Sequence, residues 1–528
     1  MNLEELVGKR LVIGIPGTKI TPEIVNHFKE LRAGGIILYR INFENPGQLK
    51  KLIQDLELAL QRKLLVMADH EGGRVIMFEK GVTIFPDNLA LGKTEKIEYA
   101  RLQGKIEAKE LRRLGIDVNL SPVLDVLTDA YSPNIGIRSY GKDWKLVSEM
   151  GCARIKALQE HGISACAKHF PGKGHAPVDA HLGLPVIQSS WAEMKKSHLK
   201  PFIKAIEIGI DMIMSSHPYY PKLDLTPQTI ATFSRKIIHD TLRKELNFKG
   251  IISSDDLEMG AIKAVCPIGE AAVKAVQAGH DILLVCHDLN AQKEVFHHLM
   301  DAYKNDRLSI NELEESVERI NQLQNKRKKR FEGGAPHAEK NGKKLVQKIT
   351  QESVTILQDK NRILPLKTKN NIPQPQKALY PRKKNSYEKI KKTLIIFPRF
   401  SELAKKIMIE KELQDEKKFL LNSFKRFNLK PKLFLIAIEP LNKEIEAVKL
   451  SIKNVERIIL FCFDAHLYPS NKRLLEVVQD SKKEGIIILL RDPYDIEMVK
   501  KSAACITNFG YRACQIKSSI EKIFLSSI

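Results

Sequence analysis

The sequence SACAKHFPGKGHAPVDAHLGLP, residues 164–185, begins as a short apolar run and continues as a loop rich in glycine and proline. The apolar run has the length of a buried strand and ends in Lys168 and His169. The loop then carries Asp179 and His181. A buried strand that delivers charged residues to a long loop indicates the edge of an active site.

Asp179 and His181 are the residues of this loop that could take part in catalysis. In an extended segment residues i and i+2 point to the same side, so the carboxylate of Asp179 can lie beside the imidazole of His181. Such a carboxylate fixes the tautomer of a histidine and favours its protonated form, which suits a proton donor near neutral pH. The alternative is a loop aspartate that bonds its own backbone beside an unrelated histidine. A second apolar run, residues 250–260 (GIISSDDLEMG), ends in Asp255 and Asp256, and two such strand ends favour one shared site.

Apolar runs of strand length alternate with amphipathic helical segments over the first part of the chain. The eight expected strands are 10–14, 35–39, 64–69, 117–124, 164–169, 211–217, 250–255 and 281–286. The expected helices include 48–63, 96–114, 146–161, 192–208, 234–246 and 268–278. This alternation predicts an α/β fold of the (β/α)8 TIM-barrel type. A doubly wound nucleotide-binding sheet is disfavoured, because neither G-x-G-x-x-G nor G-x-x-x-x-G-K-S/T occurs.

The carboxyl ends of the strands carry the chemistry in barrels of this type. The predicted strands end in or beside the ionisable groups Asp69-His70-Glu71, Asp125, Lys168-His169, His217, Asp255-Asp256 and His287-Asp288. The sequence therefore meets the requirement of a barrel enzyme at most of its strand ends.

A second domain is expected after the barrel. Residues 328–344 (KKRFEGGAPHAEKNGKK) are charged and have few large apolar residues, which is typical of a linker. We predict a barrel domain over 1–328, a basic linker over 329–347 and a smaller α/β layered domain over 348–528. The last domain has apolar runs at 393–397, 433–438, 457–463 and 485–490. Its strand ends bear few polar groups, so we expect it to serve as a covering or oligomerising structure.

The composition narrows the class of protein. The net charge of +23 can indicate a nucleic-acid partner, but the lysines are spread over helical polar faces and aromatic residues are 6% of the chain, so we expect none. No apolar run approaches the ~18 residues of a membrane span, so we expect no membrane partner. The seven cysteines form no C-x-x-C pair, which fits a reducing compartment and gives no zinc site. Because the start of the chain also lacks the pattern of a signal peptide, we expect a cytoplasmic protein.

Five ordered motifs make the first domain similar to a known family. They are Asp-His-Glu-Gly-Gly-Arg-Val (69–75), Ser-Pro-Val-Leu-Asp (121–125), Ile-Arg-Ser-Tyr-Gly (137–141), Lys-His-Phe-Pro-Gly (168–172) followed by Asp179-x-His181, and Ser-Asp-Asp-Leu-Glu-Met (254–259). In this order they resemble glycoside hydrolase family 3, in particular its branch of NagZ-like β-N-acetylglucosaminidases (β-N-acetylhexosaminidases). Residues 349–357 and 364–366 also resemble the start of the second domain of longer members.

The resemblance implies a retaining exo-β-N-acetylglucosaminidase that works without a metal or cofactor. It implies that Asp255 is the nucleophile that attacks the anomeric carbon, that His181 is the general acid/base, and that Asp179 orients His181. The residues implied to hold the sugar hydroxyls are Asp69, Arg138, Lys168 and His169. These roles agree with the chemistry, because a retaining glycosidase needs a carboxylate on one face of the sugar and a proton donor at the leaving oxygen.

Some of these roles have alternatives. Asp256 points the other way if the strand continues, so Asp255 is preferred as the nucleophile. Lys168 and His169 could instead form a structural ion pair at the rim of the barrel. Three further residues are expected in supporting positions: Glu71, Asp125 and His217.

The chain departs from the pattern of the family at two positions. The family commonly reads K-H-F-P-G-H-G, whereas Lys173 replaces the second histidine here, and Met77 stands where an arginine is frequent. These departures leave the aglycone open, so the implied substrate is a GlcNAc-containing muropeptide of cell-wall recycling or a chitooligosaccharide. A phosphorylase is an alternative, because a neutral histidine lets phosphate approach where a carboxylate would repel it. A catalytically inactive sugar-binding or scaffold barrel is another, and we expect a monomer or a homodimer.

Overall fold

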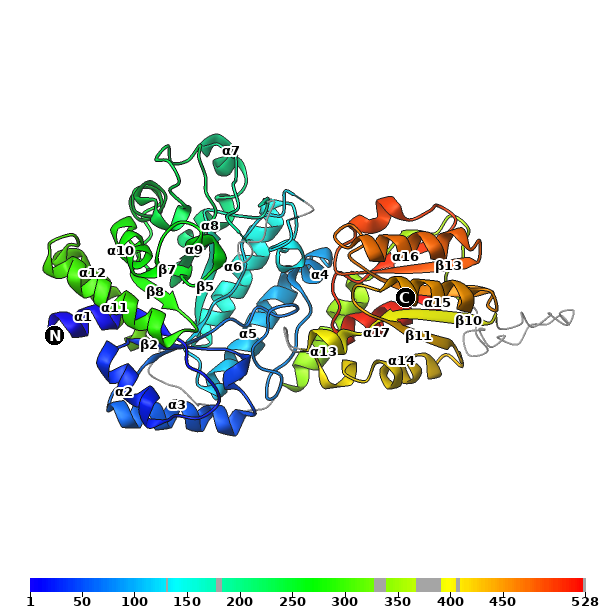
Figure 1. The fold of residues 1–528 in the computed structure, drawn as a ribbon, viewed down its shortest axis with the longest axis horizontal. Coiled ribbons are helices and arrows are strands. Elements are labelled where there is room, and N and C mark those ends of the chain that lie inside the picture. The colour runs from blue at the N-terminus through cyan, green and yellow to red at the C-terminus, as the bar shows by residue number, and fades with distance from the viewer. Residues whose placement is uncertain (130–131, 177–182, 327–338, 367–390, 405–408, 526–528) are drawn as a thin grey trace, which may run out of the picture. The chain divides into compact units, whose positions relative to one another are not determined.

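The computed structural model describes residues 1–129, 132–176, 183–326, 339–366, 391–404 and 409–525. The chain divides into two compact units, Met1–Leu345 and Val346–Ile528 (Figure 1). Asp179 and His181, which the sequence predicts to be catalytic, lie outside the described residues.

The first unit is a closed barrel of eight parallel strands. The strands are β1 (Leu11–Ile13), β2 (Gly35–Leu38), β3 (Leu65–Ala68), β4 (Val118–Asn119), β5 (Ser164–Phe170), β6 (Met212–Ser215), β7 (Ile251–Asp256) and β8 (Ile282–Val285). Each strand pairs with its neighbours in sequence, and β8 closes the ring by pairing with β1. The predicted TIM barrel is confirmed, with all eight strands inside or overlapping the expected runs.

The interior of the barrel is a hydrophobic core. One cluster of buried side chains takes residues from every strand: Val12, Ile37, Leu65, Met67, Val118, Cys166, Met212, Met214, Ile251, Ile282 and Leu284. Where a strand contributes two residues they are two positions apart, as expected for one face of a strand. Ile320 and Leu323 of α12 (Ile310–Lys326) join this cluster. Since the interior is filled, polar chemistry is confined to the ends of the strands.

The helices of the first unit lie outside the strands (Figure 1). They are α1 (Leu3–Lys9), α2 (Pro22–Leu31), α3 (Pro46–Leu60), α4 (Asn88–Lys93), α5 (Ile97–Leu114), α6 (Trp144–Glu160), α7 (Trp191–Lys196), α8 (Lys200–Glu207), the π-helix η4 (Lys236–Glu245), α9 (Gly260–Lys263), α10 (Ile268–Ala278), α11 (Leu289–Lys304) and α12. Local signals set several of their starts. Asn45, for example, caps α3 by accepting a hydrogen bond from the backbone N–H of Gln48.

Two predicted elements differ from the structure in their extent. The single helix expected over 192–208 is two helices, α7 and α8, because Pro201 lies in the first turn of α8 and cannot donate a backbone hydrogen bond to a preceding turn. The strand expected over 117–124 is regular only at β4, since Pro122 interrupts the ladder. Pairing with β5 resumes at Val123, which bridges to Lys168.

The second unit contains a six-stranded sheet in the order β11-β10-β12-β13-β14-β9. Its strands are β9 (Thr355–Gln358), β10 (Thr393–Pro398), β11 (Lys432–Ile436), β12 (Arg457–Phe463), β13 (Glu484–Leu490) and β14 (Ala504–Thr507). Its helices include α14 (Glu416–Lys425), α15 (Asn442–Ile452), α16 (Pro469–Asp480) and α17 (Ala513–Phe524). All neighbours are parallel except β9, which pairs antiparallel with β14 at the edge. The smaller α/β domain is confirmed, although the sequence indicated only four of these strands.

The segment between the two sheets is partly helical. α13 (Lys340–Ser353) begins inside the range 329–347 that was predicted to be a linker. Leu345 and Ile349 lie one helical turn apart and are buried, which gives this segment an apolar face despite its charge. Residues 327–338 lie outside the described part of the chain.

Candidate active site

The carboxyl ends of β3, β5 and β7 bring the predicted sugar-binding residues and Asp255 into one region. Lys168 lies in β5, and its ammonium Nζ is 2.6 Å from Oδ1 of Asp69, which directly follows β3. Arg138 ends the 3-10 turn η2 (Gly136–Arg138), and its Nη2 lies 3.4 Å from Nε2 of His169. Asp255 lies near the end of β7, where Lys173, His217 and Lys168 lower the pKa of its carboxyl group against the effect of burial. These five residues therefore form one connected electrostatic site.

Glu71 connects the two cations of this site. Its Oε1 lies 2.6 Å from Nζ of Lys168 and 2.7 Å from Nη2 of Arg138, and its Oε2 accepts a second bond from Nε of Arg138 at 2.9 Å. The carboxylate is 1% exposed. Burial alone would raise the pKa of Glu71, but Arg138 and Lys168 hold it well below its usual range. Glu71 is thus a buried anion that fixes both cations, a larger role than the sequence indicated.

Asp69 is the accessible acid beside this pair. Its side chain is 25% exposed, whereas that of Glu71, two positions later, is 1% exposed. Burial raises the pKa of Asp69 to about 6, although Lys168 acts in the opposite direction. An ionised and partly exposed carboxylate can accept hydrogen bonds from hydroxyl groups of a ligand.

Asp125 fixes the orientation of His169 through two hydrogen bonds. Oδ2 of Asp125 accepts hydrogen bonds from Nδ1 of His169 at 2.7 Å and from its backbone N–H at 3.2 Å. Burial, together with the cations Lys173, Arg138 and Lys168, lowers the pKa of His169 well below its ordinary value. His169 is therefore neutral, with the proton on Nδ1 and with Nε2 as an acceptor.

Asp255 is held as an anion at the end of β7. Its Oδ1 accepts a hydrogen bond of 2.9 Å from the backbone N–H of Asp256, and its Oδ2 lies 3.8 Å from Nζ of Lys173. Burial acts to raise the pKa of Asp255, but Lys173, His217 and Lys168 outweigh it and lower the pKa. The side chain is 18% exposed, so a ligand can reach this carboxylate.

Asp256 has a different environment from its neighbour. Its Oδ1 accepts hydrogen bonds from the backbone N–H groups of Glu258 at 3.1 Å and Cys286 at 3.3 Å. Burial raises the pKa of Asp256 to about 6. Its backbone carbonyl also accepts a bond of 3.0 Å from Nε2 of His217. Asp256 and His217 therefore tie the ends of neighbouring strands together.

Lys173 is a residue of this site that the sequence analysis did not predict. Its backbone N–H donates to Oδ1 of Asp125 at 2.6 Å, while its ammonium faces Asp255. The only signal for Lys173 in the sequence was its departure from the K-H-F-P-G-H-G pattern.

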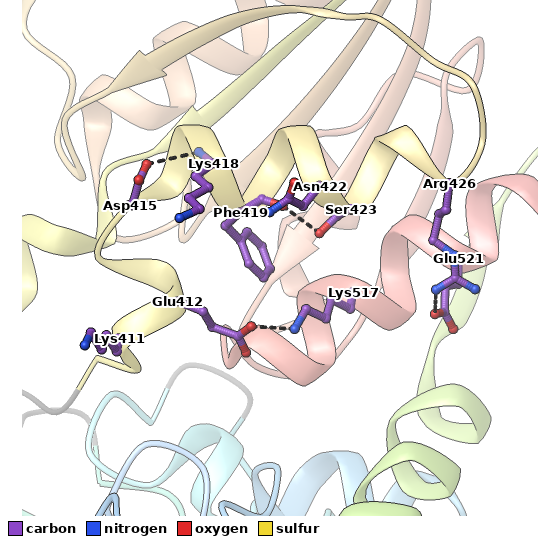
Figure 2. A pocket seen from close by; sticks show the side chains of 10 residues that line it. All are labelled: Lys411, Glu412, Asp415, Lys418, Phe419, Asn422, Ser423, Arg426, Lys517 and Glu521. Atoms are coloured by element: carbon purple, nitrogen blue, oxygen red, sulfur yellow. Dashed lines mark hydrogen bonds and ion pairs between the residues drawn. The ribbon is translucent and has the colours of Figure 1, made fainter.

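A charged groove in the second unit is separate from these residues. It has a volume of about 770 Å³ and lies along α14 and α17. Figure 2 shows the side chains that line it. Its charged side chains pair with each other, as in Lys517 with Glu412 and Arg426 with Glu521. It contains none of the predicted site residues.

The described residues contain no group of three or more His, Cys, Asp or Glu side chains that could hold a metal ion. They also contain no helix that is both long and apolar enough to cross a membrane.

This TIM barrel gathers carboxylates, cations and a neutral histidine at the carboxyl ends of its strands, where barrel enzymes carry their active sites. Residues 3–323 match the model of the glycosyl hydrolase family 3 N-terminal domain, and the chain belongs to this family. It is therefore a glycoside hydrolase.

Relatives of known name agree with this assignment. The chain is 34% identical over 295 residues to a beta-hexosaminidase of Methylobacillus flagellatus, covering 55% of this chain and 83% of that one. It is 36% identical over 280 residues to a beta-hexosaminidase of Neisseria meningitidis, covering 52% of this chain and 76% of the other. A solved family 3 β-N-acetylglucosaminidase from Paenibacillus is similar over 99% of this chain and 97% of its own, with a TM-score of 0.88 and 27% identity.

Proposed function

We propose that this glycoside hydrolase is a retaining exo-β-N-acetylglucosaminidase. The observation that carries the proposal is Asp255, an accessible carboxylate at the end of β7 that lies 3.8 Å from Nζ of Lys173 and whose pKa is lowered by Lys173, His217 and Lys168. The names of the related beta-hexosaminidases and of the Paenibacillus β-N-acetylglucosaminidase support the choice of sugar.

The residues around Lys168 would bind the terminal GlcNAc. Asp69 would accept hydrogen bonds from sugar hydroxyls. Lys168, Arg138 and His169 would bind hydroxyl groups of the same sugar. This assignment is supported by the exposure of Asp69 and by the buried anion Glu71, which keeps the two cations in place. Rigid support of this kind lowers the cost of orienting the sugar.

Asp255 would act as the nucleophile. Its carboxylate oxygen would form a bond to the anomeric carbon while the bond from that carbon to the leaving oxygen breaks. His181 would protonate the leaving oxygen, and Asp179 would orient His181; both assignments rest on the sequence pattern. In the second step His181 would take a proton from water, and the resulting attack on the anomeric carbon would release GlcNAc and restore Asp255.

The proposed substrates are fragments of peptidoglycan with a terminal GlcNAc, in a cytoplasmic recycling reaction, with chitooligosaccharides as the alternative. The seven cysteines are all free thiols, which supports a reducing compartment. We propose that the second unit is a covering or oligomerising structure that supplies no catalytic group.

Hydrolysis of p-nitrophenyl β-GlcNAc and p-nitrophenyl β-glucoside, each with and without phosphate, tests the proposal. We expect release of β-GlcNAc without phosphate and little turnover of the glucoside. A rate that depends on phosphate and yields GlcNAc 1-phosphate would instead identify a phosphorylase. No turnover of either substrate would contradict the proposal.

A further inference from the structure

Lys173 is a buried cation that the proposed reaction leaves without a role. It lies just beyond β5, and the backbone bond to Asp125 fixes the position of its main chain. Its side chain is 3% exposed, although lysine is rarely buried without a charged partner. A partner must therefore account for its position.

The acidic partner of Lys173 among the described ion pairs is Asp255. The distance of 3.8 Å between Nζ and Oδ2 exceeds that of a hydrogen bond, so the interaction is one of charge with charge. The other two cations of the site form their direct contacts with other acids. Lys168 contacts Asp69 and Glu71 at 2.6 Å, and Arg138 binds both oxygens of Glu71.

We propose that Lys173 is the counter-ion of Asp255, a positioning residue that keeps this partly exposed carboxylate ionised. The inference rests on the proposed function, in which Asp255 is the nucleophile. Burial lowers the pKa of Lys173 overall, and Asp255 is the largest of the influences that act to raise it, as expected for two opposite charges that stabilise each other. Histidine, which is common at this position in the family, would carry this charge only when protonated.

The local setting shows how much Asp255 needs such a partner. Among the described residues, the charged and titratable groups that interact electrostatically with Asp255 include Lys173, Lys168, Cys166, His217 and Asp256. The buried Asp125 and the partly exposed Asp69 lie in the same site, and each has a pKa raised to about 6. Asp255 differs from both in having a lowered pKa, and Lys173 is the largest of the influences that lower it.

The pH dependence of activity alone would not isolate this effect, because burial raises the pKa of Asp69 and of Asp125 to about 6 and both residues belong to the proposed site. A direct experiment is a ¹³C titration of the carboxyl group of Asp255 in the full chain, labelled at aspartate Cγ. The resonance is assigned by its absence in Asp255→Asn. Wild type is compared with Lys173→Met, which has no charge, and with Lys173→Arg, which retains it. Lys195→Met, which removes an exposed lysine paired with Glu245, is the control.

We expect the titration midpoint of Asp255 to rise by at least about one pH unit in Lys173→Met. It should stay close to the wild-type value in Lys173→Arg and in Lys195→Met. An unchanged midpoint in folded Lys173→Met would overturn the proposal. If Lys173→Met does not fold, Lys173→Gln provides the same comparison with a polar side chain.

The titration needs no turnover, so it separates the two proposals. A wild-type enzyme that cleaves no β-GlcNAc substrate would refute the proposed function, whatever the midpoint of Asp255. An active wild type whose Asp255 midpoint is insensitive to the charge at position 173 would refute only the role of Lys173. A merely structural role for Lys173 would lower stability in Lys173→Met without moving the midpoint.

Discussion

Glu71 and Arg138 form a bidentate ion pair, with Nη2 to Oε1 at 2.7 Å and Nε to Oε2 at 2.9 Å. The guanidinium is 10% exposed and the carboxylate 1% exposed. Bidentate pairs of this kind fix the orientation of both groups. The accessible side of Arg138 is therefore presented in one orientation, which suits recognition of a sugar.

Replacement of Glu71 by glutamine should weaken both substrate binding and stability. Arg138 would lose its acidic partner among the described residues, and breaking a buried ion pair from one side costs about 3–5 kcal/mol of unfolding free energy. Denaturant unfolding and the KM for p-nitrophenyl β-GlcNAc would measure the two effects. Glu312→Gln, at an exposed pair with Arg235, is the control and should change neither. A stable Glu71→Gln with an unchanged KM would show that Glu71 does not support the site.

Removal of the Asp255 carboxylate should abolish turnover. Asp255→Ala lacks the group that bonds to the anomeric carbon, so we expect kcat/KM to fall by about 10⁴-fold or more. Asp256→Asn is a matched control, because its oxygen can still accept the backbone bonds from Glu258 and Cys286. That variant should lose about tenfold or less. If Asp256→Asn were the inactive variant, the nucleophile would be misassigned.

The fold could be predicted from the sequence because its signals are local. The apolar run of β5 ends in Lys168 and His169, and that of β7 ends in Asp255 and Asp256. Repeated at most strands, this pattern is sufficient for a barrel with polar strand ends. β9 and β14 were missed because neither is a run of large apolar residues: β9 (TILQ) is a partly exposed strand at the edge of the sheet, and β14 (ACIT) has one large apolar side chain, Ile506.

The detailed site could not be predicted in the same way. Asp69 and Glu71 are two positions apart, yet one is partly exposed and the other is buried between two cations. The contact of Lys173 with Asp255 joins two different strand ends, and sequence spacing gives no distance between them. The different environments of Asp69, Glu71 and Asp255 come from burial and from partners that are distant in the sequence. The sequence alone therefore does not distinguish the roles of these three acids.

Activity should decrease on the acid side of neutral pH. Burial raises the pKa of Asp69 and of Asp125 to about 6, and both must be ionised, one to hold Lys168 and the other to accept from His169. As the pH falls through about 6 these carboxylates take up protons and the contacts weaken. We expect kcat/KM to rise between pH 5 and pH 7, which initial rates with p-nitrophenyl β-GlcNAc would show. A rate that stays constant down to about pH 4.5 would mean that neither carboxylate needs its charge.

The leaving group should determine how much His181 matters. A general acid protonates the departing oxygen, so its removal harms a glycoside with a basic leaving group far more than one with an activated phenol. For His181→Ala we expect kcat/KM for a GlcNAc disaccharide to fall by about 10²- to 10⁴-fold, with a much smaller loss for 2,4-dinitrophenyl β-GlcNAc. Asp179→Asn should show the same selectivity to a lesser degree, since it removes only the partner of the acid. Equal losses on the two substrates in His181→Ala would assign the proton donor to another residue, because the rate would then not depend on a proton from position 181.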